Sequence, residues 1–122
     1  MIILDTNILI EILKGDRKTV DTVESLTEQL SISSITAMEL YYGALNKAEL
    51  KKLEKFVSLF DIIHIDETIS RMAVKLIKRY AKSHSLDIPD SLIASTALLN
   101  DAMLLTYNKK DFKYIEGLKL LK

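Results

Sequence analysis

Four acidic residues of this chain lie just after predicted strands or near the starts of predicted helices: Asp5, Glu39, Asp90 and Asp111. Asp5 directly follows the apolar run Ile2–Leu4, with no turn between strand and helix. Glu39 lies one turn into the helix after "LSIS", Asp90 opens a nearly all-apolar helix, and Asp111 follows the strand "AMLLTYN". Ligands of parallel sheets collect beyond the carboxyl ends of the strands. We therefore expect the four side chains to converge on one edge.

A cluster of carboxylates predicts a particular chemistry. Packed acids repel one another and raise each other's pKa values, and a divalent cation relieves that repulsion. The chain has no cysteine and only two histidines, neither of them well placed, so oxygen ligands favour Mg²⁺ or Mn²⁺ over Zn²⁺. Such an ion lowers the pKa of bound water and stabilises charge on a phosphoryl group. The pattern predicts metal-assisted phosphodiester hydrolysis.

Helix capping is the competing explanation for these acids. Asp5, Asp90 and Asp111 each stand at a predicted helix start, where a carboxylate accepts backbone N–H bonds and complements the helix dipole. Taken singly, capping explains each of the three about as well as a metal site does. Glu39 lies between two apolar residues, so solvation alone explains it less well. For the nearby Asp87, capping is the preferred interpretation.

Composition narrows the class of protein. The 122 residues include 48% hydrophobic and 28% charged residues, and 17 basic residues balance 17 acidic ones. A neutral chain lacks the field of a non-specific nucleic-acid binder, so any positive surface must be local. The absence of cysteine excludes disulfides and thiol nucleophiles. We expect a cytoplasmic protein with no membrane segment, because no signal-peptide pattern or long apolar run is present.

The hydrophobic pattern predicts short apolar strands alternating with helices. Because only three glycines and one proline interrupt the chain, loops must be short, and residues 1–122 are expected to form a single domain. This alternation is typical of a three-layer α/β/α fold with a short parallel central sheet and helices on both faces. The predicted strands are 2–4, 30–35, 61–66, 102–108 and 118–121, and the predicted helices are 8–13, 20–30, 35–46, 50–60, 67–84 and 87–100, with a helical turn at 109–115.

Other phosphoryl-transfer folds fit the opening segment less well. A haloacid-dehalogenase-type phosphatase usually needs a second aspartate two residues after its nucleophile, and that position is Asn7. A receiver domain needs an acidic pair near the end of its first strand, where only Asp5 is present. The chain also has no glycine-rich loop of the P-loop or dinucleotide-binding type.

Four segments together resemble one known family: "ILDTNILIEIL", "ISSITAMELYYGA", "DIPDSLIASTALLND" and "LLTYNKKDFKYIEGLKL". Their order and content are similar to the PIN-domain ribonucleases and, within them, to the VapC-type toxins of toxin–antitoxin pairs. The resemblance implies that Asp5 and Asp90 are the most direct metal ligands. Glu39 and Asp111 would complete the site, directly or through water. Whether Asp111 or Asn108 does so, and whether one or two ions bind, stays open.

The resemblance also implies supporting residues and partners. Thr6, Asn7, Thr106 and Asn108 would orient the carboxylates or touch phosphate. Lys109 and Lys110 flank the predicted site, where they could contact RNA phosphates. The expected protein is an Mg²⁺- or Mn²⁺-dependent endoribonuclease toxin, a homodimer held in check by an antitoxin whose C-terminal segment blocks the acids. The alternatives are a non-catalytic PIN-like module that binds RNA or protein, and a housekeeping RNA-processing nuclease.

Overall fold

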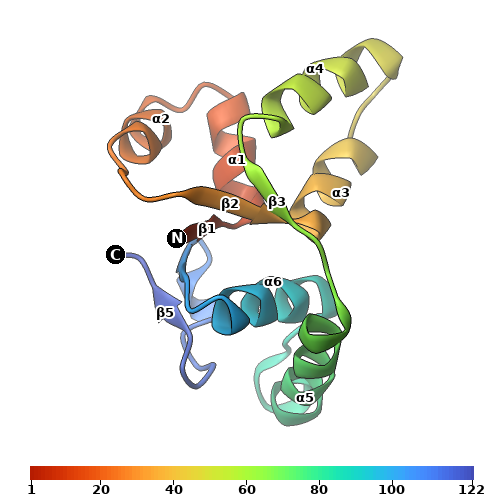
Figure 1. Ribbon diagram of the computed structural model, residues 1–122, viewed down its shortest axis with the longest axis vertical. Coiled ribbons are helices and arrows are strands. Elements are labelled where there is room, and N and C mark those ends of the chain that lie inside the picture. Colours follow the sequence, from red (N-terminus) through yellow and green to blue (C-terminus); the bar gives the residue numbers. More distant parts are fainter.

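A five-stranded parallel sheet forms the centre of the computed structural model, which describes residues 1–122 (Figure 1). The strand order is β3-β2-β1-β4-β5, and every neighbouring pair is parallel. The strands are short because both ends of each are taken over by loops or helices. Their bounds are β1 Ile2–Leu4, β2 Leu30–Ser33, β3 Asp61–Ile63, β4 Met103–Leu105 and β5 Lys119–Leu120.

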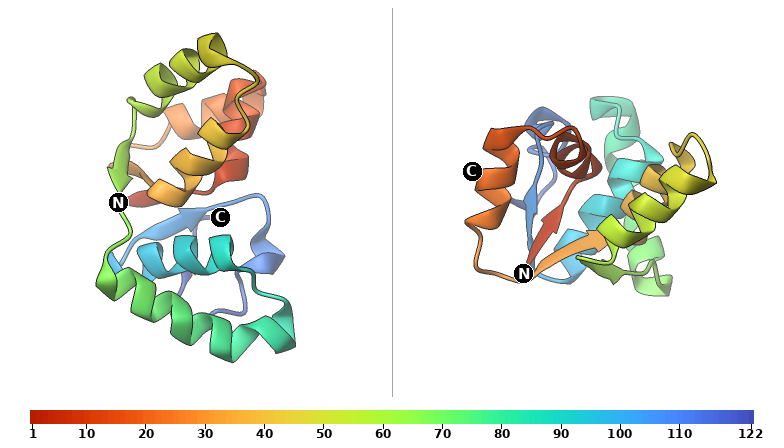
Figure 2. Two further views of the ribbon diagram at one scale, coloured as in Figure 1. Left: turned by 90° about the vertical axis from the view of Figure 1, so that its right-hand side faces the viewer. Right: turned by 90° about the horizontal axis from the view of Figure 1, so that it is seen from above.

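Helices cover both faces of this sheet. The helices before β3 pack on one side in one hydrophobic cluster, and the helices between β3 and β4 pack on the other side in a second cluster (Figure 2). The first group is α1 Thr6–Leu13, α2 Arg17–Glu24, α3 Ser34–Tyr42 and α4 Lys47–Val57; the second is α5 Glu67–His84 and α6 Ile88–Leu99. A short 3-10 turn, η1, spans Lys109–Asp111. The predicted three-layer α/β/α class is confirmed.

Strand β1 lies between two hydrophobic cores. Ile3 packs with residues of α5 and α6 in one cluster, whereas Ile2 and Leu4 pack with residues of α1, α3 and α4 in the other. This division follows from the alternation of side chains along a strand. All three side chains are essentially inaccessible, and burying each is worth about 1.5–3 kcal/mol. The two cores therefore fix the end of β1, and with it the position of Asp5.

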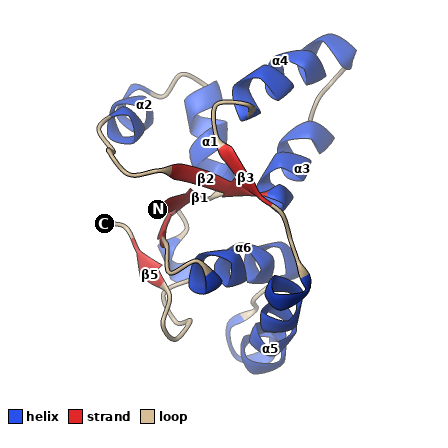
Figure 3. Ribbon diagram, viewed as in Figure 1, coloured by secondary structure: helices blue, strands red, loops and turns tan.

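Several predicted helix boundaries are wrong, and caps explain the differences. The helix predicted to reach residue 46 ends at Tyr42, where Gly43 is the C-cap. The next helix starts at Lys47 rather than near residue 50, because the Asn46 side chain accepts a hydrogen bond from the Glu49 N–H at 2.9 Å. Helix α2 ends at Glu24, and a loop replaces the rest of the predicted helix up to β2 (Figure 3).

Helix α6 is buried along its middle turns. Ile93, Ala94 and Ala97 are inaccessible, as the nearly all-apolar sequence predicts, whereas Ile88 at its start is 67% exposed. The predicted final edge strand is present as β5, which pairs with β4. None of the helices has the length and apolar character that crossing a membrane requires.

Candidate active site

Three of the four predicted acids lie together in one pocket of about 230 Å³ at the carboxyl ends of the strands. The pocket is formed where α1, α3 and α6 begin, beside the exits of β1 and β4. It is lined by Asp5, Thr6, Asn7, Ile10, Glu39, Asp90 and Asn108. Asp111 is not part of this lining. The expected convergence at one edge of the sheet is therefore confirmed for Asp5, Glu39 and Asp90.

Asp5 is held rigidly at the end of β1. Its side chain is only 5% exposed, and it caps α1 by accepting the Thr6 N–H at 2.8 Å on Oδ1. Its Oδ2 accepts the Thr106 hydroxyl at 2.7 Å and the Asn7 amide at 3.1 Å. Burial raises the pKa of Asp5, and these hydrogen bonds oppose the rise. Capping and a role in the pocket are therefore compatible, because the cap fixes the carboxylate's direction.

Two linked threonine hydroxyls hold the Glu39 side chain in the pocket. Thr6 Oγ1 donates to Glu39 Oε1 at 2.7 Å and lies 2.9 Å from Thr36 Oγ1. Since Thr6 has one hydroxyl proton, Thr36 donates to Thr6. Glu39 itself is exposed at the mouth of the pocket. Sequence reasoning missed Thr36, although its place one turn before Glu39 on the same helix was an available signal.

Asp90 carries the least stabilised negative charge of the pocket. The Asp87 side chain caps α6 by accepting the Asp90 N–H at 2.9 Å, which confirms the capping interpretation of Asp87. The Asp90 carboxylate itself makes no hydrogen bond or ion pair within the chain. Burial is the main cause that raises the pKa of Asp90 from 3.8 to about 7. The charges of the surrounding carboxylates, that of Asp87 first, add to this rise. Asp90 therefore needs a positive partner to stay ionised.

The residues after β4 divide into two groups. Asn108 lines the acidic pocket, and its N–H donates to Thr106 Oγ1 at 2.9 Å. Asp111 lies on η1 behind it, yet its charge raises the pKa of both Asp5 and Asp90. Lys109 and Lys110 do not line this pocket. Asn108 thus belongs to the pocket lining, and Asp111 adds to the negative field that acts on it.

No cation of the chain neutralises the pocket. The five ion pairs lie elsewhere, and none includes Asp5, Glu39, Asp90 or Asp111. No group of three or more acidic, histidine or cysteine side chains is arranged so that it could hold a metal ion directly. Mg²⁺ does not require such a cage, because it keeps several waters and takes one or two carboxylates plus substrate phosphates. An oxygen-only pocket with unbalanced charge fits that ion.

Removing the Thr106 hydroxyl tests whether the orientation of Asp5 matters. If the family resemblance implies the right activity, we expect Thr106→Val to lower RNA cleavage about 10–100-fold, the usual effect of losing an outer-shell partner of a metal ligand. It should also cost about 1–2 kcal/mol of stability, because a buried carboxylate oxygen loses a donor. Cleavage kinetics and urea unfolding measure the two effects. Thr106→Ser keeps the hydroxyl and should behave as wild type; equal activity of the valine and serine variants would contradict this role.

Comparison with known proteins gives a consistent picture. The PIN domain family matches residues 2–118. The chain is 33% identical to ribonuclease VapC19 of Mycobacterium tuberculosis over 123 residues, which cover 98% of each chain. Among solved structures it is similar to VapBC2 from Rickettsia felis bound to a DNA fragment from its promoter. That match has a TM-score of 0.84 and 33% identity, and it covers 99% of this chain and 98% of the other. A toxin–antitoxin complex from Klebsiella pneumoniae matches with a TM-score of 0.83 and 35% identity, and the match covers 97% of this chain and 95% of the other.

Proposed function

Because the chain belongs to the PIN-domain family and within it to the VapC ribonucleases, we propose that it is an Mg²⁺- or Mn²⁺-dependent endoribonuclease that acts as the toxin of a toxin–antitoxin pair. One observation carries the proposal. Asp5, Glu39 and Asp90, which are widely separated in sequence, line a single pocket with no counter-charge from the chain. A site built only to bind RNA gains nothing from such repulsion.

Each acid has a distinct task in this proposal. Asp5 and Asp90 would hold the ion, and three hydrogen-bond donors fix the direction of the Asp5 carboxylate. When bound, the ion supplies charge stabilisation at the phosphate and lowers the pKa of a bound water. Glu39, exposed at the mouth and fixed by Thr6, orients the attacking water. Asp111 adds negative field from η1, and Asn108 offers an amide to the phosphate.

The proposed partner is a small antitoxin. Structures similar to this chain are described as toxin–antitoxin complexes, which supports a partner of the same kind here. A basic side chain from that partner, placed between Asp5 and Asp90, would neutralise them and exclude the ion. We also propose that the chain forms a homodimer, as the family resemblance implies. Co-expression with the neighbouring small gene, followed by size-exclusion chromatography, tests both assemblies.

Metal-dependent cleavage of total cellular RNA is the test of the proposed function. We expect the purified protein to cut RNA with added Mg²⁺ or Mn²⁺ and to stop when EDTA removes the ion. Mapping the new 5′ ends identifies the RNA and the position cut. Unchanged cleavage in EDTA would contradict the mechanism. RNA binding without cleavage under any metal would favour the binding-module alternative.

Expression in the host separates a toxin from a housekeeping nuclease. Induction of this chain alone should arrest growth, and induction together with its antitoxin should restore it. The Asp5→Asn variant serves as the control, because it should leave growth unaffected in both cases. Growth that is unchanged by the wild-type chain, combined with RNA cleavage in vitro, would favour the housekeeping role.

A further inference from the structure

A second polar pocket lies beside the acidic one and has the opposite charge. Its volume is about 300 Å³, and it is formed between α2, the exit of β4 and the last residue of the chain. The side chains that matter here are Lys18, Thr19, Thr106, Tyr107, Lys109 and Lys122. No acidic residue lines it. We call it the lysine pocket.

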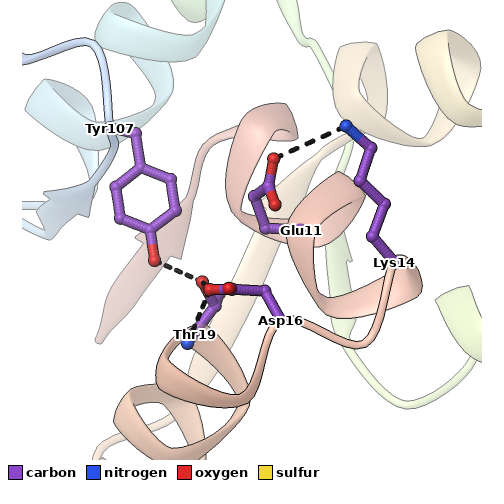
Figure 4. Close-up of polar contacts among 5 residues, drawn as sticks. All are labelled: Glu11, Lys14, Asp16, Thr19 and Tyr107. Atoms are coloured by element: carbon purple, nitrogen blue, oxygen red, sulfur yellow. Dashed lines mark hydrogen bonds and ion pairs between the residues drawn. The ribbon is translucent and has the colours of Figure 1, made fainter.

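A hydrogen-bonded bridge closes one side of the lysine pocket. The Tyr107 hydroxyl bonds the Thr19 hydroxyl, which in turn donates to Asp16 Oδ2 at 2.6 Å (Figure 4). Asp16 Oδ2 also accepts the Thr19 N–H at 3.1 Å, so that it caps α2. These contacts tie the loop after β4 to α2. The pocket is therefore a built feature of the fold, shaped by residues far apart in sequence.

The three lysines of this pocket are free of acidic partners. Lys18, Lys109 and Lys122 form none of the five ion pairs of the chain. Hydrogen bonds from Thr19, and to a smaller extent the charge of Lys18, lower the pKa of Asp16, so that carboxylate is held mainly by Thr19. In a chain with a net charge of zero, the ammonium groups of Lys18 and Lys109 around one hollow form a local positive site. Such a site favours a multiply charged anion.

The lysine pocket and the acidic pocket meet at Thr106. Thr106 lines the lysine pocket, while its hydroxyl donates to Asp5 Oδ2 at 2.7 Å on the acidic side. The next residue, Tyr107, donates its N–H to Asn7 Oδ1 at 3.2 Å, and Asn7 lines the acidic pocket. A strand whose scissile phosphate occupies the acidic pocket therefore reaches the lysines with an adjacent part of its backbone.

We propose that the lysine pocket binds a backbone phosphate of the single-stranded RNA next to the cleaved bond. The inference rests on the proposed nuclease function. Four carboxylates repel a polyanion, so the chain needs cations beside them to hold the strand, and lysines act as point-charge phosphate ligands. The side chains of this pocket that can donate to an anion are chiefly the ammonium groups. RNA fits better than an acidic protein segment because two residues of this pocket, Thr106 and Tyr107, are hydrogen-bonded to residues of the proposed cleavage site.

The test compares Lys18→Ala/Lys109→Ala with a matched control of equal charge, Lys55→Ala/Lys75→Ala, whose lysines are exposed on α4 and α5. We expect the first variant to raise the KM for RNA about five- to tenfold at 0.1 M salt, with kcat within about twofold, because uniform binding is lost. The slope of log KM against log salt should fall by about 0.7 for each lost phosphate contact. The control should change neither quantity.

Three outcomes decide the matter. A KM and salt slope equal to those of wild type would overturn the subsite. So would an unchanged KM accompanied by weaker binding of the antitoxin, which would assign the pocket to a protein partner. If wild type does not cleave RNA, the proposed function fails instead. In that case RNA binding measured in EDTA still tests whether the lysine pocket binds phosphate, because phosphate contacts made by lysine need no metal.

Discussion

Asp5→Asn is expected to lower metal-dependent RNA cleavage at least about a hundredfold, an effect of the size seen when one preorganised electrostatic group is removed. The amide keeps an oxygen that can accept the Thr6 N–H, but it removes the negative charge that the cation needs. Asp5 is buried and held by three hydrogen-bond donors. We therefore expect that no other carboxylate can take its place. Cleavage of a fluorescent RNA oligonucleotide over a range of Mn²⁺ concentrations measures the loss.

Asp66→Asn is the matched control for this prediction. Asp66 is also a helix N-cap, on α5, and its carboxylate accepts the Ile69 N–H, yet it lines neither the acidic pocket nor the lysine pocket. Asparagine caps helices about as well as aspartate, so both variants should remain folded by circular dichroism. Comparable activity of the two variants would remove Asp5 from the mechanism.

Asp90→Asn is expected to stabilise the metal-free protein while it abolishes cleavage. The pKa of Asp90 is raised from 3.8 to about 7, so between these pH values the folded state binds more protons than the unfolded state. Stability from this group is present below about pH 4 and is lost as the pH rises through 7. Asparagine cannot ionise and avoids that loss. After allowance for solvent screening of a half-buried side chain, the gain at pH 8 is about 1–2 kcal/mol.

Urea unfolding in EDTA at pH 5 and pH 8 measures this difference. The advantage of Asp90→Asn over wild type should be larger at pH 8 than at pH 5. Asp66→Asn is the control, because Asp66 caps α5 away from the pocket and its replacement should give the same difference at both pH values. An Asp90→Asn variant less stable than wild type at pH 8 would show that the negative charge is compensated within the chain.

The main site residues could be predicted from sequence because the fold class determines where they lie. Short apolar runs followed at once by polar residues indicate parallel strands that end at a common edge, and Asp5 follows from that rule. Asp90 opens α6, the helix that leads into β4, and the start of that helix lies at the same edge. The same rule predicted Asp111 in the cluster, but η1 carries it out of the pocket lining, and Asn108 lines the pocket instead. The conformation of the few residues between β4 and the end of η1 accounts for this difference between Asn108 and Asp111.

Long-range side-chain contacts were beyond the reach of sequence reasoning. The relay from Thr36 through Thr6 to Glu39 depends on how α1 packs against α3. The bond between Thr19 and Tyr107 joins residues 88 positions apart, and nothing in either local sequence predicts it. Lys109 was expected to flank the acids and lines the neighbouring pocket, but the sequence did not indicate the partners with which it forms that pocket. Periodicity places elements in layers, but tertiary packing chooses the partners.

Calorimetric titration of Mn²⁺ into the wild-type protein tests the central claim most directly. If the acids at the edge of the sheet form a cation site, the protein should bind Mn²⁺ with a saturable heat at or below millimolar concentrations, and Asp5→Asn should bind it much more weakly. Asp66→Asn should retain wild-type binding. Equal heats for wild type and Asp5→Asn, or none up to several millimolar Mn²⁺, would contradict the account.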